Sequence, residues 1–244
     1  MTRFIIAGLV LFNANLAVAF DLNNISIGGA VDAFKAATLS SEDARALSLK
    51  AIKQYDGQNK VAPADDKYAK RLADLTSKHT EEDGLKLNFK AYLVDEMNAF
   101  ATADGSIRFF SGLMDKMSDE ELLFVIGHEI GHVKLEHSKK KMKTAYATSA
   151  ARKSVAAAGG DLGSVAASEL GGIAESMVNA TYSRKEESAS DGYGVEFMKK
   201  HGYNPTNAVS ALKKLAELGD SSSILASHPA PTKRAKAISK KYKL

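Results

Sequence analysis

The chain has 244 residues, of which 45% are hydrophobic, so it is long enough to bury the core of one large domain. Its formal net charge of +4 is small, and no basic stripe interleaved with aromatic residues indicates nucleic-acid binding. The sequence contains no cysteine, which excludes disulfides and a lipid-accepting cysteine after a leader segment.

The first nineteen residues have the pattern of a secretory signal peptide. Arg3 supplies a positive start, residues 4–16 form a short apolar stretch, and residues 17–19 (Ala-Val-Ala) give a small-residue cleavage site. No later stretch approaches about 18 uncharged apolar residues, so no transmembrane helix is expected. We therefore expect residues 1–19 to be a signal peptide cleaved near Ala19, and residues 20–244 to form a single domain outside the cytoplasm.

Two helices and a small sheet are predicted in the first half of the mature chain. Helical patterns cover about residues 40–57 and 64–78, and strand patterns cover residues 87–94 and 106–110. The turn Asp104-Gly105 precedes the second strand, and the whole predicts a small antiparallel sheet. An exposed edge of this sheet could receive an extended peptide by strand addition, or the sheet could be plain scaffold.

A helix that begins at Ser118 carries the strongest motif, His-Glu-x-x-His. Ser118 and Glu121 form a predicted capping box, followed by an apolar run. On such a helix His128 and His132 lie one turn apart on one face, where both imidazoles can bind the same tetrahedral metal ion. Glu129 points beside that metal and can take a proton from a bound water. The alternative is a buried helix whose histidines pair with backbone groups or carboxylates.

The third metal ligand must be sought further along the chain. A catalytic zinc normally has three protein ligands, and His137 would lie on another face of a continuous helix. Glu187 has a second carboxylate four residues later, at Asp191, and such a like-charge pair destabilises a helix unless a cation is near. This favours Glu187 as the ligand and Asp191 as acceptor for a ligand imidazole, although an acidic pair is often only a solvated face.

The C-terminal region contains a His-Pro pair, His228-Pro229, followed by a basic segment. A His-Pro loop alone is typical of a structural turn. The basic segment is typical of the solvated face of a last helix, and the alternative is a patch for anionic surfaces.

These segments together resemble the HtpX-, BepA- and LoiP-type zinc peptidases, the bacterial relatives of the CAAX prenyl protease, and the LoiP type most of all. The resemblance covers nearly the whole mature chain, and Ser190 departs from it by replacing the usual alanine. It rests on four segments in order: Asn98-Ala99-Phe100-Ala101, His128-Glu129-Ile130-Gly131-His132, Ser183-Arg184-x-x-Glu187-x-x-Ser190-Asp191 and His228-Pro229.

The resemblance implies a mostly helical α+β fold, that of a gluzincin metallopeptidase, with a small antiparallel sheet beside the zinc-binding helix. One Zn²⁺ would be held by His128, His132 and Glu187, with Glu129 as general base and Asp191 supporting a ligand. His228 matches a family histidine that either stabilises the transition state or blocks the zinc at rest.

The resemblance also implies where a substrate would bind. An extended polypeptide would lie beside the segment Asn98, Ala99, Phe100 and Ala101. Arg234 matches a family arginine and is expected in substrate binding, and the alternative for it is a surface cation of the basic tail.

The function predicted from all of this is that of a periplasmic zinc-dependent endopeptidase acting on unfolded or misassembled envelope proteins. A zinc-bound water would be the nucleophile, and His228 could keep the enzyme latent. The protein could associate peripherally with the outer membrane. The alternatives are a chaperone-like binding protein with a capped zinc site and a metalloamidase acting on cell-wall peptides.

Overall fold

The computed structural model describes residues 37–144, 181–217 and 223–244. The predicted signal peptide therefore lies outside the described residues. Within the described ranges, no helix combines the length and the apolar character that crossing a membrane requires.

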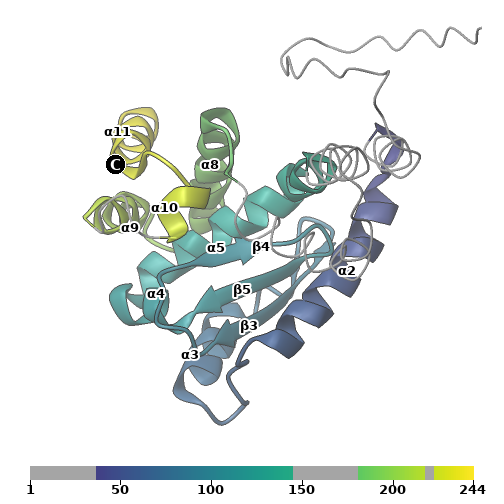
Figure 1. Cartoon of the computed structure of the whole chain (residues 1–244). Coiled ribbons are helices and arrows are strands. Elements are labelled where there is room, and N and C mark those ends of the chain that lie inside the picture. The colour runs from purple at the N-terminus through teal and green to yellow at the C-terminus, as the bar shows by residue number, and fades with distance from the viewer. Residues whose placement is uncertain (1–36, 145–180, 218–222) are drawn as a thin grey trace, which may run out of the picture.

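The described elements are helices with a few short strands, which confirms the predicted α+β, mostly helical class (Figure 1). In chain order they are α2 (Ser41–Gln58), α3 (Lys67–Thr76), β1 (Glu81–Glu82), β2 (Leu85–Lys86), β3 (Asn88–Tyr92), β4 (Ala99–Ala101), β5 (Ser106–Phe110), α4 (Ser111–Lys116), α5 (Asp119–Lys134), α8 (Arg184–Lys200), α9 (Thr206–Ala216), α10 (Ser223–Ser227) and α11 (Pro231–Tyr242).

The main sheet is mixed rather than antiparallel, which corrects the predicted strand directions. Its order is β3-β5-β4, with β5 parallel to β3 and antiparallel to β4. The reason is that residues 99–101, which connect the two predicted strands, form a strand themselves and take the antiparallel place beside β5. Strand β5 therefore lies between β3 and β4 in the sheet, although it follows both of them in the chain. A separate antiparallel ribbon joins β1 and β2.

The two faces of the sheet are covered by different helices. Tyr92, Phe100 and Phe110 form a cluster with Ile52 of α2 on one face. The alternate residues, among them Ile107 and Phe109, join the larger core that contains α5. Figure 1 shows α2 and α5 on opposite sides of the strands. Period-two alternation of strand side chains explains this division.

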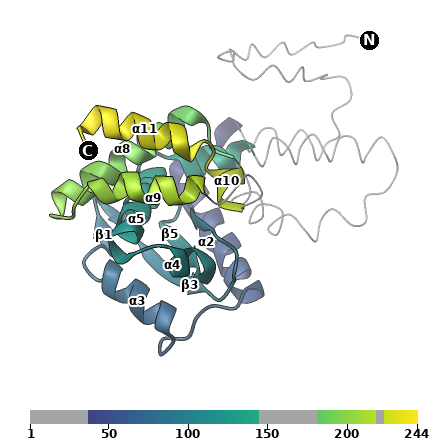
Figure 2. The same cartoon turned by 90° about the vertical axis from the view of Figure 1, so that its left-hand side faces the viewer.

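Helix α5 runs through the centre of the fold. Ser118 and Glu121 form the predicted capping box at its start, and every residue from 121 to 133 is buried. A helix buried all round must be covered on every side. Strand β4 packs on one side and α8 and α9 on others, while α11 lies along α9 and α8 (Figure 2).

Glycines let α5 and α8 approach closely. A Cβ at Gly127 would lie 2.7 Å from a ring carbon of Phe197, and one at Gly131 would lie 3.2 Å from Ser190 Cα. From the other side, a Cβ at Gly194 would lie 3.2 Å from the backbone nitrogen of His128. These contacts leave no room for larger residues. The close approach places the first turns of α8 directly against the motif helix.

Candidate metal centre

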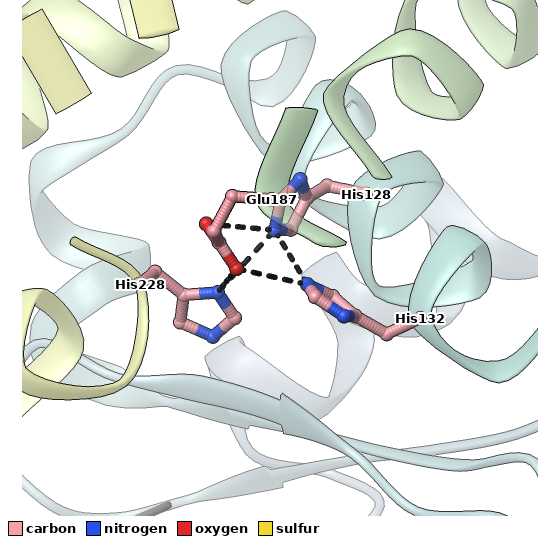
Figure 3. A group of neighbouring side chains, drawn as sticks. All are labelled: His128, His132, Glu187 and His228. Atoms are coloured by element: carbon pink, nitrogen blue, oxygen red, sulfur yellow. Dashed lines mark hydrogen bonds and ion pairs between the residues drawn. The ribbon is translucent and has the colours of Figure 1, made fainter. Parts of the chain in front are cut away.

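The two motif histidines lie on the buried side of α5 with their rings close together. His128 and His132 are 4% and 0% exposed. Their Nε2 atoms are 3.0 Å apart, and both point toward the same space (Figure 3). The one-turn spacing on the helix therefore produces the shared site that the motif predicts.

Helix α8 brings a carboxylate to the same space. Glu187, which is fully buried, has its Oε1 3.3 Å from His132 Nε2 and its Oε2 3.8 Å from His128 Nε2. A capping box between Ser183 and Glu186 fixes the first turn of α8, in which Glu187 lies. The structure thus places the predicted third ligand beside the two histidines.

His228 reaches the cluster from the loop between α10 and α11. Its Nδ1 is 3.0 Å from Glu187 Oε1 and 3.3 Å from His128 Nε2. One ligand atom from each of the four residues lies within 4.8 Å of the others. The backbone N–H of His228 donates to the carbonyl of Ile224, which ties the loop to α10.

The donor atoms of this cluster fit a cation. Asp191 Oδ1 lies 3.1 Å from His128 Nδ1, so that nitrogen carries the proton and the Nε2 lone pair faces inward. His132 Nδ1 contacts His137 Nδ1 at 3.1 Å, and burial lowers the pKa of His132 well below its usual value, which keeps this ring neutral. Two imidazole nitrogens and a carboxylate that converge this closely are the donor set of a bound cation such as zinc.

Arg234 is buried beside the donor cluster. It is 8% exposed, and its Nε and Nη2 donate to both oxygens of Asp191 at 2.8 and 2.6 Å. Its Nη1 pairs with Glu187 Oε2. Burial raises the pKa of Asp191, but the Arg234 charge outweighs it and the pKa is lowered. The alternative of a surface cation is therefore wrong, and Arg234 contacts the carboxylates of both Glu187 and Asp191.

Glu129 lies beside the donor cluster and not in it. The side chain is 1% exposed, and its Oε1 is 3.6 Å from His228 Nε2. Its Oε2 has no hydrogen-bond partner among the described residues. A buried carboxylate oxygen with a free acceptor site next to a metal position is suited to accept a proton.

The predicted substrate segment forms β4, the edge strand of the sheet nearest α5. Asn98, Ala99, Phe100 and Ala101 are all buried. Hydrogen bonds of Asn98 and Thr102 run to β5, so the odd-numbered residues direct their backbone groups to the outer edge. On that edge the Met97 carbonyl accepts from Ile224 N at 3.2 Å, and the Ala101 carbonyl accepts from Ser138 Oγ at 3.0 Å.

Three side chains that lie near the donor cluster were not among the predicted site residues. His137 approaches His132 because α5 ends at Lys134 and Glu136 adopts a φ of 57°, so the helix is not continuous. The Tyr182 ring stacks on His132 with 3.6 Å between centroids, and Lys141 Nζ lies 3.4 Å from the Tyr182 ring centre. Burial lowers the pKa of Lys141 to about 7. The left-handed residue is not visible in the helical pattern, so sequence spacing could not reveal these contacts.

A His-Glu-x-x-His helix joined by a glutamate from a second helix defines a metallopeptidase of the gluzincin class. The model of peptidase family M48 matches residues 66–242, and the chain belongs to this family. It is 41% identical over 218 residues to Metalloprotease YcaL of Escherichia coli (strain K12), covering 88% of this chain and 86% of that protein. It is 40% identical over 221 residues to Metalloprotease LoiP of the same strain, with 89% and 87% covered.

A more distant relative is also a protease. The Beta-barrel assembly-enhancing protease of Escherichia coli (strain K12) is 30% identical over 169 residues, which cover 62% of this chain and 34% of that protein. The predicted family resemblance is confirmed. The chain is a metalloendopeptidase, a hydrolase of peptide bonds, as the motif predicted.

Proposed function

We propose that this protein is a periplasmic, zinc-dependent endopeptidase that cleaves unfolded or misassembled envelope proteins. The observation that carries the proposal is the convergence of His128, His132 and Glu187 beside the free carboxylate oxygen of Glu129. Support for envelope substrates comes from the distant relative whose name refers to β-barrel assembly. Support for export comes from the signal-peptide pattern of residues 1–19.

Zinc is the metal we assign to the cluster, because two imidazoles and one carboxylate suit it and leave an open position. When bound by His128, His132 and Glu187, zinc would supply a water of lowered pKa and polarise the scissile carbonyl. Asp191 keeps His128 in the tautomer that presents Nε2, and Arg234 holds Asp191 and Glu187 in place.

Glu129 moves the protons of the reaction. Its carboxylate takes a proton from the attacking water as the oxygen adds to the peptide carbonyl carbon. The same proton then passes to the leaving nitrogen as the carbon–nitrogen bond breaks. Once His228 has left the open metal position, its imidazole N–H donates to the carbonyl oxygen as charge develops there.

We assign the substrate to the outer edge of β4. The outward backbone groups of Ala99 can pair with an extended polypeptide, since the odd-numbered residues of β4 face away from β5. Such pairing recognises the substrate through main-chain hydrogen bonds rather than through side chains. This suits a peptidase that acts on many unfolded chains.

Latency is part of the proposal. His228 Nδ1 lies within the donor cluster, and the next element back, α10, covers the Met97 carbonyl at one end of the β4 edge. A single displacement of the α10–His228 segment would therefore free both the open metal position and part of the substrate edge. The serine run before α10 lies partly outside the described residues.

Latency is tested by the binding of a small hydroxamate, which needs the open metal position. His228→Ala protein should bind the hydroxamate at least about tenfold more tightly than the wild type, because the position is no longer filled. Equal affinity would show that His228 does not cap the metal. Loss of transition-state stabilisation alone would lower turnover and would not tighten hydroxamate binding.

Cleavage of casein by the mature chain tests the function itself. Glu129→Gln should lower the rate by about 10²–10⁴-fold, the usual contribution of a general base. Glu120→Gln, an exposed position on the same helix, is the matched control and should cleave normally. Chelation should abolish cleavage by the wild type, and zinc should restore it. Full activity of Glu129→Gln would contradict the proposed role.

A further inference from the structure

A second group of metal-binding side chains lies outside the centre described above. His79 precedes β1, Glu82 ends β1, and His201 follows the last residue of α8. Glu82 Oε2 is 2.8 Å from His201 Nε2 and 3.8 Å from His79 Nδ1. One ligand atom from each of the three lies within 4.8 Å of the others. The group therefore joins segments more than 110 residues apart in the sequence.

His79 is the residue whose state requires an explanation. Its side chain is 1% exposed, and its Nδ1 has no hydrogen-bond partner among the described residues. Its Nε2 lies 2.8 Å from the hydroxyl of Tyr203. The contact with Tyr203 occupies Nε2 and leaves the Nδ1 atom facing Glu82.

A cation between His79 Nδ1 and Glu82 Oε2 would give the buried Nδ1 atom the partner that it lacks. The 3.8 Å from His79 Nδ1 to Glu82 Oε2 is too long for a hydrogen bond. It is near the roughly 3.3 Å that separates two ligands of a tetrahedral zinc with bonds of about 2.0 Å. The second oxygen of Glu82 pairs with Lys200, so Oε2 is the oxygen left for a metal.

We infer that His79 Nδ1, Glu82 Oε2 and His201 Nε2 form a second zinc site. Two imidazoles and a carboxylate are donors that zinc prefers, and Tyr203 holds the His79 tautomer as an outer partner of a ligand does. Because the site joins two elements of the scaffold, we give it a structural role. It would fasten the start of β1 to the end of α8, the helix whose first turns carry Glu187 and Asp191.

The alternative is a polar group without metal, in which Glu82 pairs with Lys200 and His201. The two arrangements predict different zinc contents. A metal site requires His79, Glu82 and His201 together, whereas a polar group without metal holds no zinc whichever residue is changed.

Zinc content of the full chain, measured by native mass spectrometry after zinc saturation and gel filtration, tests the inference. The wild type should carry two zinc ions, and His201→Gln and Glu82→Gln should carry one. Glu81→Gln, at the exposed neighbouring position, is the matched control and should carry two. Zinc contents of His201→Gln and Glu82→Gln that equal the wild-type content would overturn the inference.

A double variant separates this inference from the proposed function. His128→Ala/His132→Ala protein should still carry one zinc ion, and its melting temperature should rise when zinc is added. Adding His201→Gln should remove both the ion and the rise. Loss of all zinc from the double variant, with the fold verified by circular dichroism, would overturn the second site whatever the peptidase assay shows.

Discussion

Replacing Asp191 by asparagine tests how the ligand His128 is held. In the wild type, Asp191 accepts from His128 Nδ1 at 3.1 Å and from Arg234 at 2.6 and 2.8 Å. Asparagine keeps one acceptor and turns the other into a donor. Whichever way the asparagine amide is turned, its NH₂ group faces another donor. That donor is the imidazole N–H in one orientation and the guanidinium in the other. The substitution also removes one of the two negative charges that Arg234 contacts.

The expected magnitude follows from the loss of an outer partner to a ligand histidine. Such losses weaken metal binding by about 10–100-fold, which is about 1.4–2.7 kcal/mol. In this variant Glu187 is the one carboxylate left to balance the Arg234 charge. This weakens metal binding further, because Glu187 Oε2 is drawn more strongly to the guanidinium. We therefore expect an effect at the upper end of this range.

The assay is casein cleavage at a series of buffered free zinc concentrations. Asp191→Asn should need a free zinc concentration about 100-fold higher for half-maximal cleavage than the wild type. Asp74→Asn, at an exposed position, is the control and should not change the midpoint. A midpoint for Asp191→Asn within twofold of the wild type would refute the role of Asp191 in holding the ligand.

Two further predictions concern the scaffold of the site. Gly127→Ala should lower the free energy of unfolding by about 1–3 kcal/mol, measured by urea denaturation, because the added Cβ would meet the Phe197 ring at 2.7 Å; an unchanged midpoint would contradict the close approach of α5 and α8. Asp56→Asn should cost about 3–5 kcal/mol in the same assay, since it leaves buried Arg108 without its partner. The pKa of Asp56 is lowered from 3.8 to about 2, where burial opposes and the hydrogen bond to Arg108 favours the charged form. Its contribution of about 2 kcal/mol is therefore present above about pH 4 and lost as the pH falls toward 2, and a wild-type stability that does not fall more steeply there than that of Asp56→Asn would refute it.

Local sequence signals predicted the first residues of helices well. The helix predicted for residues 40–57 is α2, with Ser40 as its N-cap, and the box of Ser118 and Glu121 opens α5. Capping depends on residues three apart, so the sequence contains the whole signal. The end of α5 was missed because a positive φ at Glu136 has no marker such as glycine.

Contacts between distant segments were harder to predict. Glu187 was predicted because the His-Glu-x-x-His motif supplies two metal ligands and leaves a third to be found. An acidic pair later in the chain can supply that third ligand. The parallel pairing of β3 with β5 depends on where the chain returns, which strand patterns do not contain. Arg234 looked like part of a basic tail, and only the packing of α11 shows that it is buried against Asp191. The group of His79, Glu82 and His201 has no sequence spacing that would connect its members.

The casein-cleaving activity of Glu187→Gln tests most directly whether His128, His132 and Glu187 hold the metal of this peptidase. The rate should fall by more than about 100-fold at moderate zinc, since even outer partners of a ligand contribute 10–100-fold. Glu196→Gln, an exposed position on the same helix, should cleave at the wild-type rate. A Glu187→Gln protein that cleaves casein as fast as the wild type would contradict the assignment of this metal centre.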